Sequence, residues 1–326
     1  IKSLIMKTTK RFIFTLLVSS LVIASCKKEE PADPTDPTPT PTGETPSAQE
    51  LKDYFSNNEN DAIQYFTADS ESPISITGSK GTQFNIQANS FETQSGGAVT
   101  GSIDIELIEI FDKADMIRLN KPTMGRKFNG DLEPLISGGE FKLTASQNGS
   151  ELNLKPGYMY NVTVPAPDGV DPNMNAFNGT VTNDTLIWDP ADSGFVQGQG
   201  NQYDCWFEQL NWINCDYFMN DPSPQTAVDV EIPQGFDNTT CMLFISFDGL
   251  NSMTSFYNYS NGVYTTAPSY TLPIGIDVHF VAVSFIAGNP HVAIVPATIQ
   301  NNHYEIIPQL NQTTPGQFQT DLNNLP

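Results

Sequence analysis

Three histidines have the residue type and the regular spacing that could bind a transition metal. They are His279, His291 and His303, each 12 residues after the one before. Imidazole nitrogens are common zinc ligands, and a 12-residue step also matches the strand repeat of a β-meander. The turn-forming pairs Asn289-Pro290 and Asn301-Asn302 place His291 and His303 at strand starts and leave His279 in mid-strand. Because neighbouring meander strands run antiparallel, these positions would not align, and we predict no metal site.

Three of the four cysteines are candidates for a disulfide. Cys205, Cys215 and Cys241 lie in the second half of the chain, and an exported protein meets an environment in which disulfides form. A bridge between Cys205 and Cys215 would close the shortest loop, and Cys215–Cys241 is the alternative bridge. The remaining alternative is that all three are buried free thiols. A catalytic thiolate would need a histidine or a helix N-terminus beside it, so we expect no catalytic cysteine.

Carboxylates are plentiful, but their spacing indicates no acid–base pair. Asp104, Glu106 and Glu109 belong to a strand whose other face is apolar, and we expect them on its solvated face. The loop acids in 168–173 and 189–192 are candidate oxygen ligands for a structural calcium ion, although neither loop has EF-hand spacing and turn-forming aspartate is common. The chain has no nucleophile-elbow, zincin or phosphate-loop motif. We therefore predict no catalytic residues and no cofactor beyond such a calcium ion.

An aromatic block between Tyr203 and Phe218 could bind a glycan. It contains Trp206 and Trp212, which share a face if the segment is one extended strand. Exposed aromatic rings stack on sugar faces, while amide and carboxylate side chains bond sugar hydroxyls. Trp206 and Trp212 are therefore candidate glycan-binding residues, and the alternative is that one of them fills the core.

The charge of the chain is unevenly distributed. There are 15 Lys and Arg residues against 37 Asp and Glu residues, a formal net charge of −22. The last basic residue is Lys155, so residues 156–326 carry negative charge without a counter-charge. Because phosphate contacts require Lys or Arg, nucleic acid is excluded as a partner of this half. The same charge opposes its docking onto anionic lipid.

The first residues resemble a bacterial lipoprotein signal. Basic residues at Lys7, Lys10 and Arg11 precede an apolar run over 12–23, which is too short to span a bilayer of about 30 Å. The run ends in Ala-Ser-Cys26, which resembles the lipobox at which a diacylglycerol is attached to cysteine. The resemblance implies a signal peptide over 1–25 and lipidation of Cys26.

The residues after Cys26 resemble those of exported Bacteroidota lipoproteins. Lys27–Glu30 is similar to their surface-export tag, and Lys27 implies sorting to the outer membrane. A Pro/Thr-rich run over 31–46 forms an extended spacer, so residues 26–50 are interpreted as a lipidated cysteine and a disordered tether. Thr185, in an Asp-Thr-Leu sequence, resembles the O-glycosylation motif of the same group and is a candidate glycosylation site.

The rest of the chain has the pattern of short β-strands. Apolar and polar residues alternate in Ser102–Ile110, in Tyr158–Val164 and in Val228–Ile232. Ile276–Ile286 is apolar on both faces, which is typical of a strand covered on both sides. Asn-Gly and Asp-Gly pairs, the favoured hairpin residues, recur between such segments.

These strands predict an all-β protein made of two antiparallel β-sandwich domains. Proline and Asp-Gly clustering over Pro165–Pro172 indicates a linker. We therefore expect one sandwich over 51–165 and a second, acidic sandwich over 166–326. Helical patterns are short and confined to Ala48–Phe55 and Asp112–Leu119.

The first sandwich resembles a known family. Gly81–Phe91 and Gly97–Leu107 are similar to the ZU-type domain shared by zonula occludens proteins and netrin receptors, in the diverged form found in Bacteroidota lipoproteins. Lys113–Ile117 and Ser137–Phe141 fit that bacterial form. The resemblance covers roughly residues 70–165 and implies a β-sandwich without an assigned activity.

The sequence thus predicts a lipid-anchored outer-membrane protein that faces the cell surface. We expect a structural, adhesive or complex-accessory role without catalysis, and the alternative function is a glycan-binding surface module. The expected partners are outer-membrane lipid through Cys26 and either a glycan or a membrane-protein complex. An exported hydrolase would require at least two acidic side chains that converge in one cleft.

Overall fold

The computed structural model describes residues 44–182 and 185–326. The expected signal peptide (1–25), Cys26 and most of the tether (26–50) lie outside these residues. The described chain consists mostly of β-strands with three short helices, which confirms the predicted all-β class. Within these residues, no helix combines the length and apolar character needed to cross a membrane.

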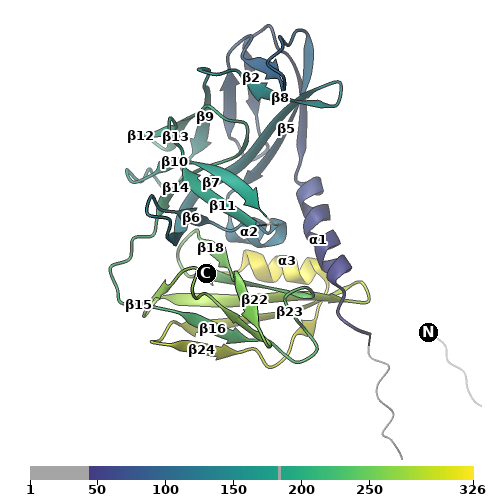
Figure 1. The fold of residues 1–326 in the computed structure, drawn as a ribbon, viewed down its shortest axis with the longest axis vertical. Helices are drawn as coiled ribbons and strands as arrows, with labels where there is room; N and C mark the ends of the chain where they lie inside the picture. The colour runs from purple at the N-terminus through teal and green to yellow at the C-terminus, as the bar shows by residue number, and fades with distance from the viewer. Residues whose placement is uncertain (1–43, 183–184) are drawn as a thin grey trace, which may run out of the picture. The chain divides into compact units, whose positions relative to one another are not determined.

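Two facing sheets form the first sandwich, with Phe84, Phe141 and Ile213 in the core between them (Figure 1). The larger sheet has the order β1 (Gln64–Asp69), β5 (Ser102–Ile110), β7 (Leu132–Gln147), β14 (Asn211–Phe218), β10 (Asn175–Thr182), β11 (Thr185–Pro190) and β6 (Met124–Arg126). At its side, β8 (Ser150–Leu154) pairs with both β7 and β4 (Phe91–Thr93). The smaller sheet has the order β12 (Phe195–Gln199), β13 (Gln202–Phe207), β9 (Tyr160–Pro165), β3 (Gln83–Ile86) and β2 (Ile74–Thr77).

A second pair of sheets encloses another core, which contains Val230, Leu243 and Phe280. One sheet has the order β19 (Asn258–Ser260), β20 (Val263–Thr265), β16 (Val228–Glu231) and β24 (His303–Ile306). The other has the order β18 (Met253–Ser255), β17 (Cys241–Phe247), β22 (Asp277–Ile286), β23 (Asn289–Thr298) and β25 (Asn311–Gln312). A short ribbon joins β15 (Gln225–Thr226) to β21 (Leu272–Pro273).

Three helices pack between these layers and bury a shared apolar cluster (Figure 1). They are α1 (Ala48–Asp61), α2 (Lys113–Leu119) and α3 (Pro315–Asn323). Each begins at a capping side chain, since Ser47, Asp112 and Thr314 accept hydrogen bonds from backbone N–H groups of the first turn. The predicted helices over 48–55 and 112–119 are thus present, and the first extends to Asp61. The tether therefore ends before Ala48 rather than at residue 50.

The helix layer explains why β22 is apolar on both faces. Phe280 and Ala282 contribute to the core of the second sandwich, while Val281 and Val283 contribute to the cluster shared with the helices. The strand is therefore covered on both sides, as the sequence of Ile276–Ile286 predicts.

Strand pairing does not stop at the expected boundary near Pro165. β9 pairs with β13 and β7 pairs with β14, so strands that follow residue 166 complete the first sandwich. The sheets of the second sandwich start only after Phe218. The Pro165–Pro172 segment is a connection inside the first sandwich, because its flanking strands belong to the two facing sheets.

Candidate functional site

The outer side of the smaller sheet carries two rows of polar and aromatic side chains. Residues on one strand alternate between the core and solvent, and register places the solvent-facing ones in line across the sheet. One row is Phe195, Trp206, Asn161, Asn85 and Ser75, and the next is Gln197, Asp204, Thr163, Gln83 and Thr77. We call these ten residues the outer face. Five strands about 4.8 Å apart make each row about 19 Å long.

A stacked aromatic pair stands at one end of the first row. The rings of Phe195 and Trp206 have centroids 4.4 Å apart and planes inclined by 12°. Phe195 is 49% exposed and Trp206 is half-buried. Each ring has one face that the other does not cover, and such faces provide the flat apolar surface on which sugar rings stack.

Amide and hydroxyl groups continue the row beyond the aromatic pair. The Ser75 hydroxyl donates to the Asn85 side chain at 2.8 Å, and the Thr163 hydroxyl donates to Asp204 at 2.8 Å. The Asn161 amide donates to the Cys205 carbonyl at 3.3 Å. These bonds hold the side chains in place and leave further donor and acceptor positions open to solvent. The outer face has no basic residue and one carboxylate, Asp204, which suits an uncharged polar ligand.

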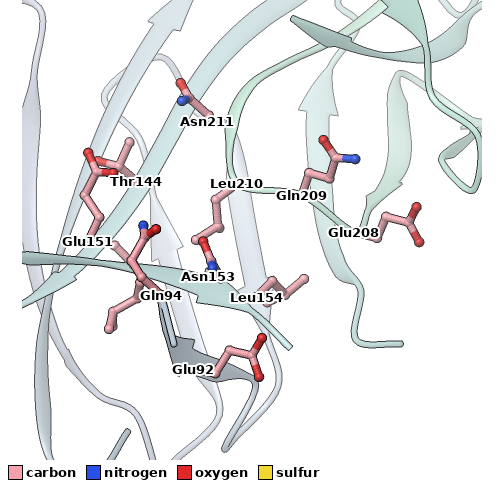
Figure 2. A pocket seen from close by; sticks show the side chains of 12 residues that line it. Glu92, Gln94, Thr144, Glu151, Asn153, Leu154, Glu208, Gln209, Leu210 and Asn211 are labelled. Carbon is pink, nitrogen blue, oxygen red and sulfur yellow. The ribbon is translucent and has the colours of Figure 1, made fainter. Parts of the chain in front are cut away.

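An acidic groove lies at the edge of the sandwich (Figure 2). Its volume is about 380 Å³. Glu92 of β4, Glu151 of β8 and Glu208, which follows β13, contribute carboxylates. The rest of the wall consists of amides, a hydroxyl and apolar side chains, and Figure 2 labels Gln94, Asn153, Gln209, Asn211, Thr144, Leu154 and Leu210 among them. Glu208 is two residues beyond Trp206 in the sequence, and none of the outer-face residues lines the groove.

Trp212 is not available as a glycan platform, contrary to the prediction. It lies in β14, on a different sheet from Trp206, and only 4% of it is exposed. Its ring is covered by the ammonium groups of Lys121 and Lys142, at 5.3 and 5.6 Å from the ring centroid. The segment from Tyr203 to Phe218 is two strands joined by a loop rather than one strand, and the two tryptophans therefore lie in different environments.

The three cysteines within the described residues, Cys205, Cys215 and Cys241, are free, buried thiols. Cys205 and Cys215 belong to the same core, whereas Cys241 lies in the core of the second sandwich. The structure therefore rules out the alternative bridge between Cys215 and Cys241. A bridge between Cys205 and Cys215 stays a prediction.

The histidines do not converge, as predicted. His279 and His291 lie on the paired strands β22 and β23, but His279 is opposite Pro296 and His291 is opposite Ser284. His303 is part of another sheet. Across residues 44–182 and 185–326, no group of three histidine, cysteine or acidic side chains has a geometry that could hold a metal.

The loop acids and the candidate glycosylation site are not among the outer-face residues. Asp171 accepts two hydrogen bonds from Asn173 within its own turn, and Asp189 pairs with Arg126 at 3.5 Å. Thr185 is the first residue of β11 and is half-buried. The predicted solvent exposure of Glu109 is wrong, because only 4% of this residue is exposed. Asp104 and Glu106 are exposed as predicted.

Most residues of the outer face are not among those that the sequence motifs point to. Asn161 and Thr163 alternate with buried valines, as do Gln83 and Asn85 with buried apolar residues, so their outward orientation could have been predicted from the period of two. Phe195 was not singled out, since its position beside Trp206 depends on the pairing of β12 with β13.

Comparisons with known proteins do not identify the chain. No protein-family model matches it, and no curated protein matches it. Among solved structures, a γ-CGTase from an alkalophilic Bacillus clarkii aligns with 73% of this chain and 41% of its own chain, at 10% sequence identity and a TM-score of 0.19. A TM-score this low indicates neither a shared fold nor a shared activity.

Proposed function

We propose that the protein is a membrane-anchored, surface-facing β-sandwich protein that binds an uncharged glycan on the outer face without catalysing a reaction. The observation that carries the proposal is the stacked pair of Phe195 and Trp206 at the end of a continuous row of amides and hydroxyls. An adhesive role follows if this glycan belongs to a neighbouring surface.

The amino-acid composition of the outer face supports a neutral ligand. Sugar hydroxyls both donate and accept hydrogen bonds, and so do amides and hydroxyls such as those of Asn85, Asn161 and Thr163. An anionic ligand would require Lys or Arg, which the outer face lacks. The sheet itself is rigid, since its other side packs in the first core, and rigidity reduces the entropic cost of binding.

The membrane anchor in this proposal rests on the sequence. The lipobox-like Ala-Ser-Cys26 and the Pro/Thr-rich tether support lipidation and a spacer between the membrane and the sandwich. A Cys26→Ala variant that still fractionates with membranes would contradict the anchor.

Affinity gel electrophoresis on a panel of neutral polysaccharides tests glycan binding. We expect retarded migration of the protein on at least one polysaccharide and a loss of about tenfold or more in affinity for Trp206→Ala, because a stacking face is removed. Tyr65→Ala is the matched control, since Tyr65 is a 71% exposed aromatic residue outside the outer face. Migration that no neutral polysaccharide retards, or equal losses in both variants, would refute the proposal.

Tryptophan fluorescence gives a second readout in the same experiment. Trp188 and Trp212 are buried, so Trp206 is the tryptophan within reach of a ligand. Binding should change the emission of the wild-type protein and leave that of Trp206→Phe unchanged.

Hydrolysis is the second candidate function, favoured by three glutamates that line one groove. Glycosidases use a pair of carboxyl groups, one of which burial keeps protonated. Glu151 is exposed and Glu92 and Glu208 are half-buried, which supports binding over catalysis. Release of reducing sugar that Glu208→Gln abolishes would favour hydrolysis instead.

A further inference from the structure

Three polar side chains converge in the interior on the helix-facing side of the larger sheet. Glu140 of β7 and Asn214 of β14 are direct cross-strand partners, so their side chains share one face. Asp216 is two residues beyond Asn214 on β14 and shares this face, because the intervening Cys215 points into the core of the first sandwich. None of the three side chains has any exposed surface.

Four oxygen atoms of this cluster have no hydrogen-bond partner. They are Oε1 and Oε2 of Glu140, Oδ1 of Asn214 and Oδ1 of Asp216. Within the cluster, the Asn214 amide donates to Oδ2 of Asp216 at 2.6 Å. Buried polar atoms are almost always paired in folded proteins, so four unpaired oxygens at one place indicate a missing positive partner.

Nearby basic groups do not supply that partner. The ammonium of Lys121 donates to Glu59 at 2.7 Å and to the Leu119 carbonyl at 3.1 Å. Lys142 is also bound to Glu59, at 2.9 Å. Both lysines are therefore engaged, and neither makes a hydrogen bond to Glu140.

The charges of the two carboxyl groups also oppose each other. Burial, and then the Asp216 carboxylate, raise the pKa of Glu140 well above its usual value, and the charge of Lys121 lowers it only in part. Burial likewise raises the pKa of Asp216 well above its usual value. Two buried like charges are stable together only with a cation or a proton between them.

We propose that Glu140, Asn214 and Asp216 form a buried structural site for a calcium ion. The donor set consists of oxygens alone, which favours a hard cation over zinc or copper. Two carboxylates balance the charge of Ca²⁺, and the amide oxygen of Asn214 adds a neutral ligand. Calcium takes roughly six to eight oxygens, so waters supplement the four unpaired ones. This site is separate from the loop acids that the sequence suggested and from the outer face.

Refolding with and without calcium tests the site. The purified protein is unfolded in guanidinium chloride with EDTA and refolded with either Ca²⁺ or EDTA. We expect close to one bound calcium ion per chain by elemental analysis after dialysis, and a melting temperature higher by about 5 °C or more with Ca²⁺.

Two isosteric variants and one control identify the ligands. Glu140→Gln and Asp216→Asn should each lose the bound calcium and the calcium-dependent rise in melting temperature. Glu106→Gln should retain both, since Glu106 is an exposed carboxylate of β5. An unchanged melting temperature with no bound calcium, or a rise with Na⁺ alone, would overturn the proposal.

Terbium luminescence provides a readout that does not depend on stability. Tb³⁺ replaces Ca²⁺ at oxygen sites and is excited through nearby indole rings. Trp212 is two residues from Asn214 and shares its strand face, so Tb³⁺ should luminesce on excitation of the wild-type protein. Trp212→Phe should weaken this signal and keep bound calcium, because the ring of Trp188 packs 6.3 Å from that of Trp212 and remains near the site. Glu140→Gln should lose both the signal and the calcium. Luminescence that survives in Glu140→Gln would place the ion elsewhere and refute the assignment.

Discussion

Cys205 and Cys215 are both buried in one core, that of the first sandwich. Cys205 belongs to β13 of the smaller sheet and Cys215 to β14 of the larger one. The hydrogen bond with Cys205, followed by burial, raises the pKa of the Cys215 thiol well above its usual value. The pair is therefore an unreactive, buried pair of thiols until an oxidant reaches it during folding.

We predict that folding in an oxidising compartment converts this pair to a disulfide. Each thiol loses a hydrogen to the oxidant, and the bridge closes a ten-residue loop, which stabilises the protein by about 2–3 kcal/mol. Mass spectrometry of peptides from unreduced protein should show Cys205 linked to Cys215. Cys241 should remain free, because it lies in the other core, and a linkage that includes Cys241 would contradict the prediction.

Glu109 is predicted to hold the loop that follows β2. Its carboxylate accepts hydrogen bonds from the backbone N–H of Lys80 at 2.9 Å, from that of Thr82 at 3.3 Å and from the Gln64 amide at 2.9 Å. Glu109→Gln replaces one acceptor oxygen by a donor that faces other donors. The free energy of unfolding in urea should fall by about 1–3 kcal/mol.

Glu106→Gln is the matched control for this variant. Glu106 lies on the same strand but is exposed, so the change should stay within about 0.5 kcal/mol. Equal stabilities of the two variants would show that the buried hydrogen bonds of Glu109 contribute nothing.

The stability of the protein should fall at acid pH through the ion pairs of the helices. Burial raises the pKa of Glu59, but Lys121 and Lys142 outweigh it, so the net pKa is lowered. The pKa of Asp115 is also lowered, because its ion pairs with Lys80 and Arg118 outweigh the effect of burial. A lowered folded-state pKa gives stability that is present above the unfolded-state pKa of about 4 and is lost as the pH falls through the folded-state value.

Melting temperatures measured from pH 6 to about pH 3 check this contribution. Glu59→Gln removes the titrating group, so its melting temperature should depend less on pH than that of the wild type. Glu106→Gln again serves as the control with an exposed carboxylate. A steeper acid dependence in Glu59→Gln would contradict the assigned sign.

Residues 44–326 should unfold in a single transition. One apolar cluster includes Leu51 of α1, Trp212 of β14 and Val281 of β22, so the two sandwiches share buried surface with the helices. If one sandwich unfolded, the other would expose the apolar surface that it shares with the helices, so we expect the two sandwiches to unfold together. Differential scanning calorimetry should give one peak, and Val281→Ala should shift the whole peak. Two resolved peaks would show that the sandwiches unfold independently.

Local patterns in the sequence predicted the elements well. The alternation in Ser102–Ile110 became β5, and the apolar run over Ile276–Ile286 became a strand covered on both faces. Both follow from the period of two along a strand, which depends only on neighbouring residues. The failure of the histidines to converge was also predictable, because it depends only on strand direction.

Partners distant in the sequence were not predictable in this way. The expected boundary at Pro165 was wrong because β9 pairs with β13 across it, and the sequence records no pairing register. Glu109 was placed with Asp104 and Glu106 for the same reason, since a loop from another part of the chain covers only its end of β5.

The sequence by itself determined the strand content and the negative charge of the second half, because these are properties of segments and composition. It also carries the lipobox-like Ala-Ser-Cys26 that supports the proposed anchor. Only the tertiary structure placed Phe195 on Trp206, buried Trp212 beneath two lysines and gathered Glu140, Asn214 and Asp216 in the interior. These contacts depend on strand register, which is set when separate segments pack together and exclude water.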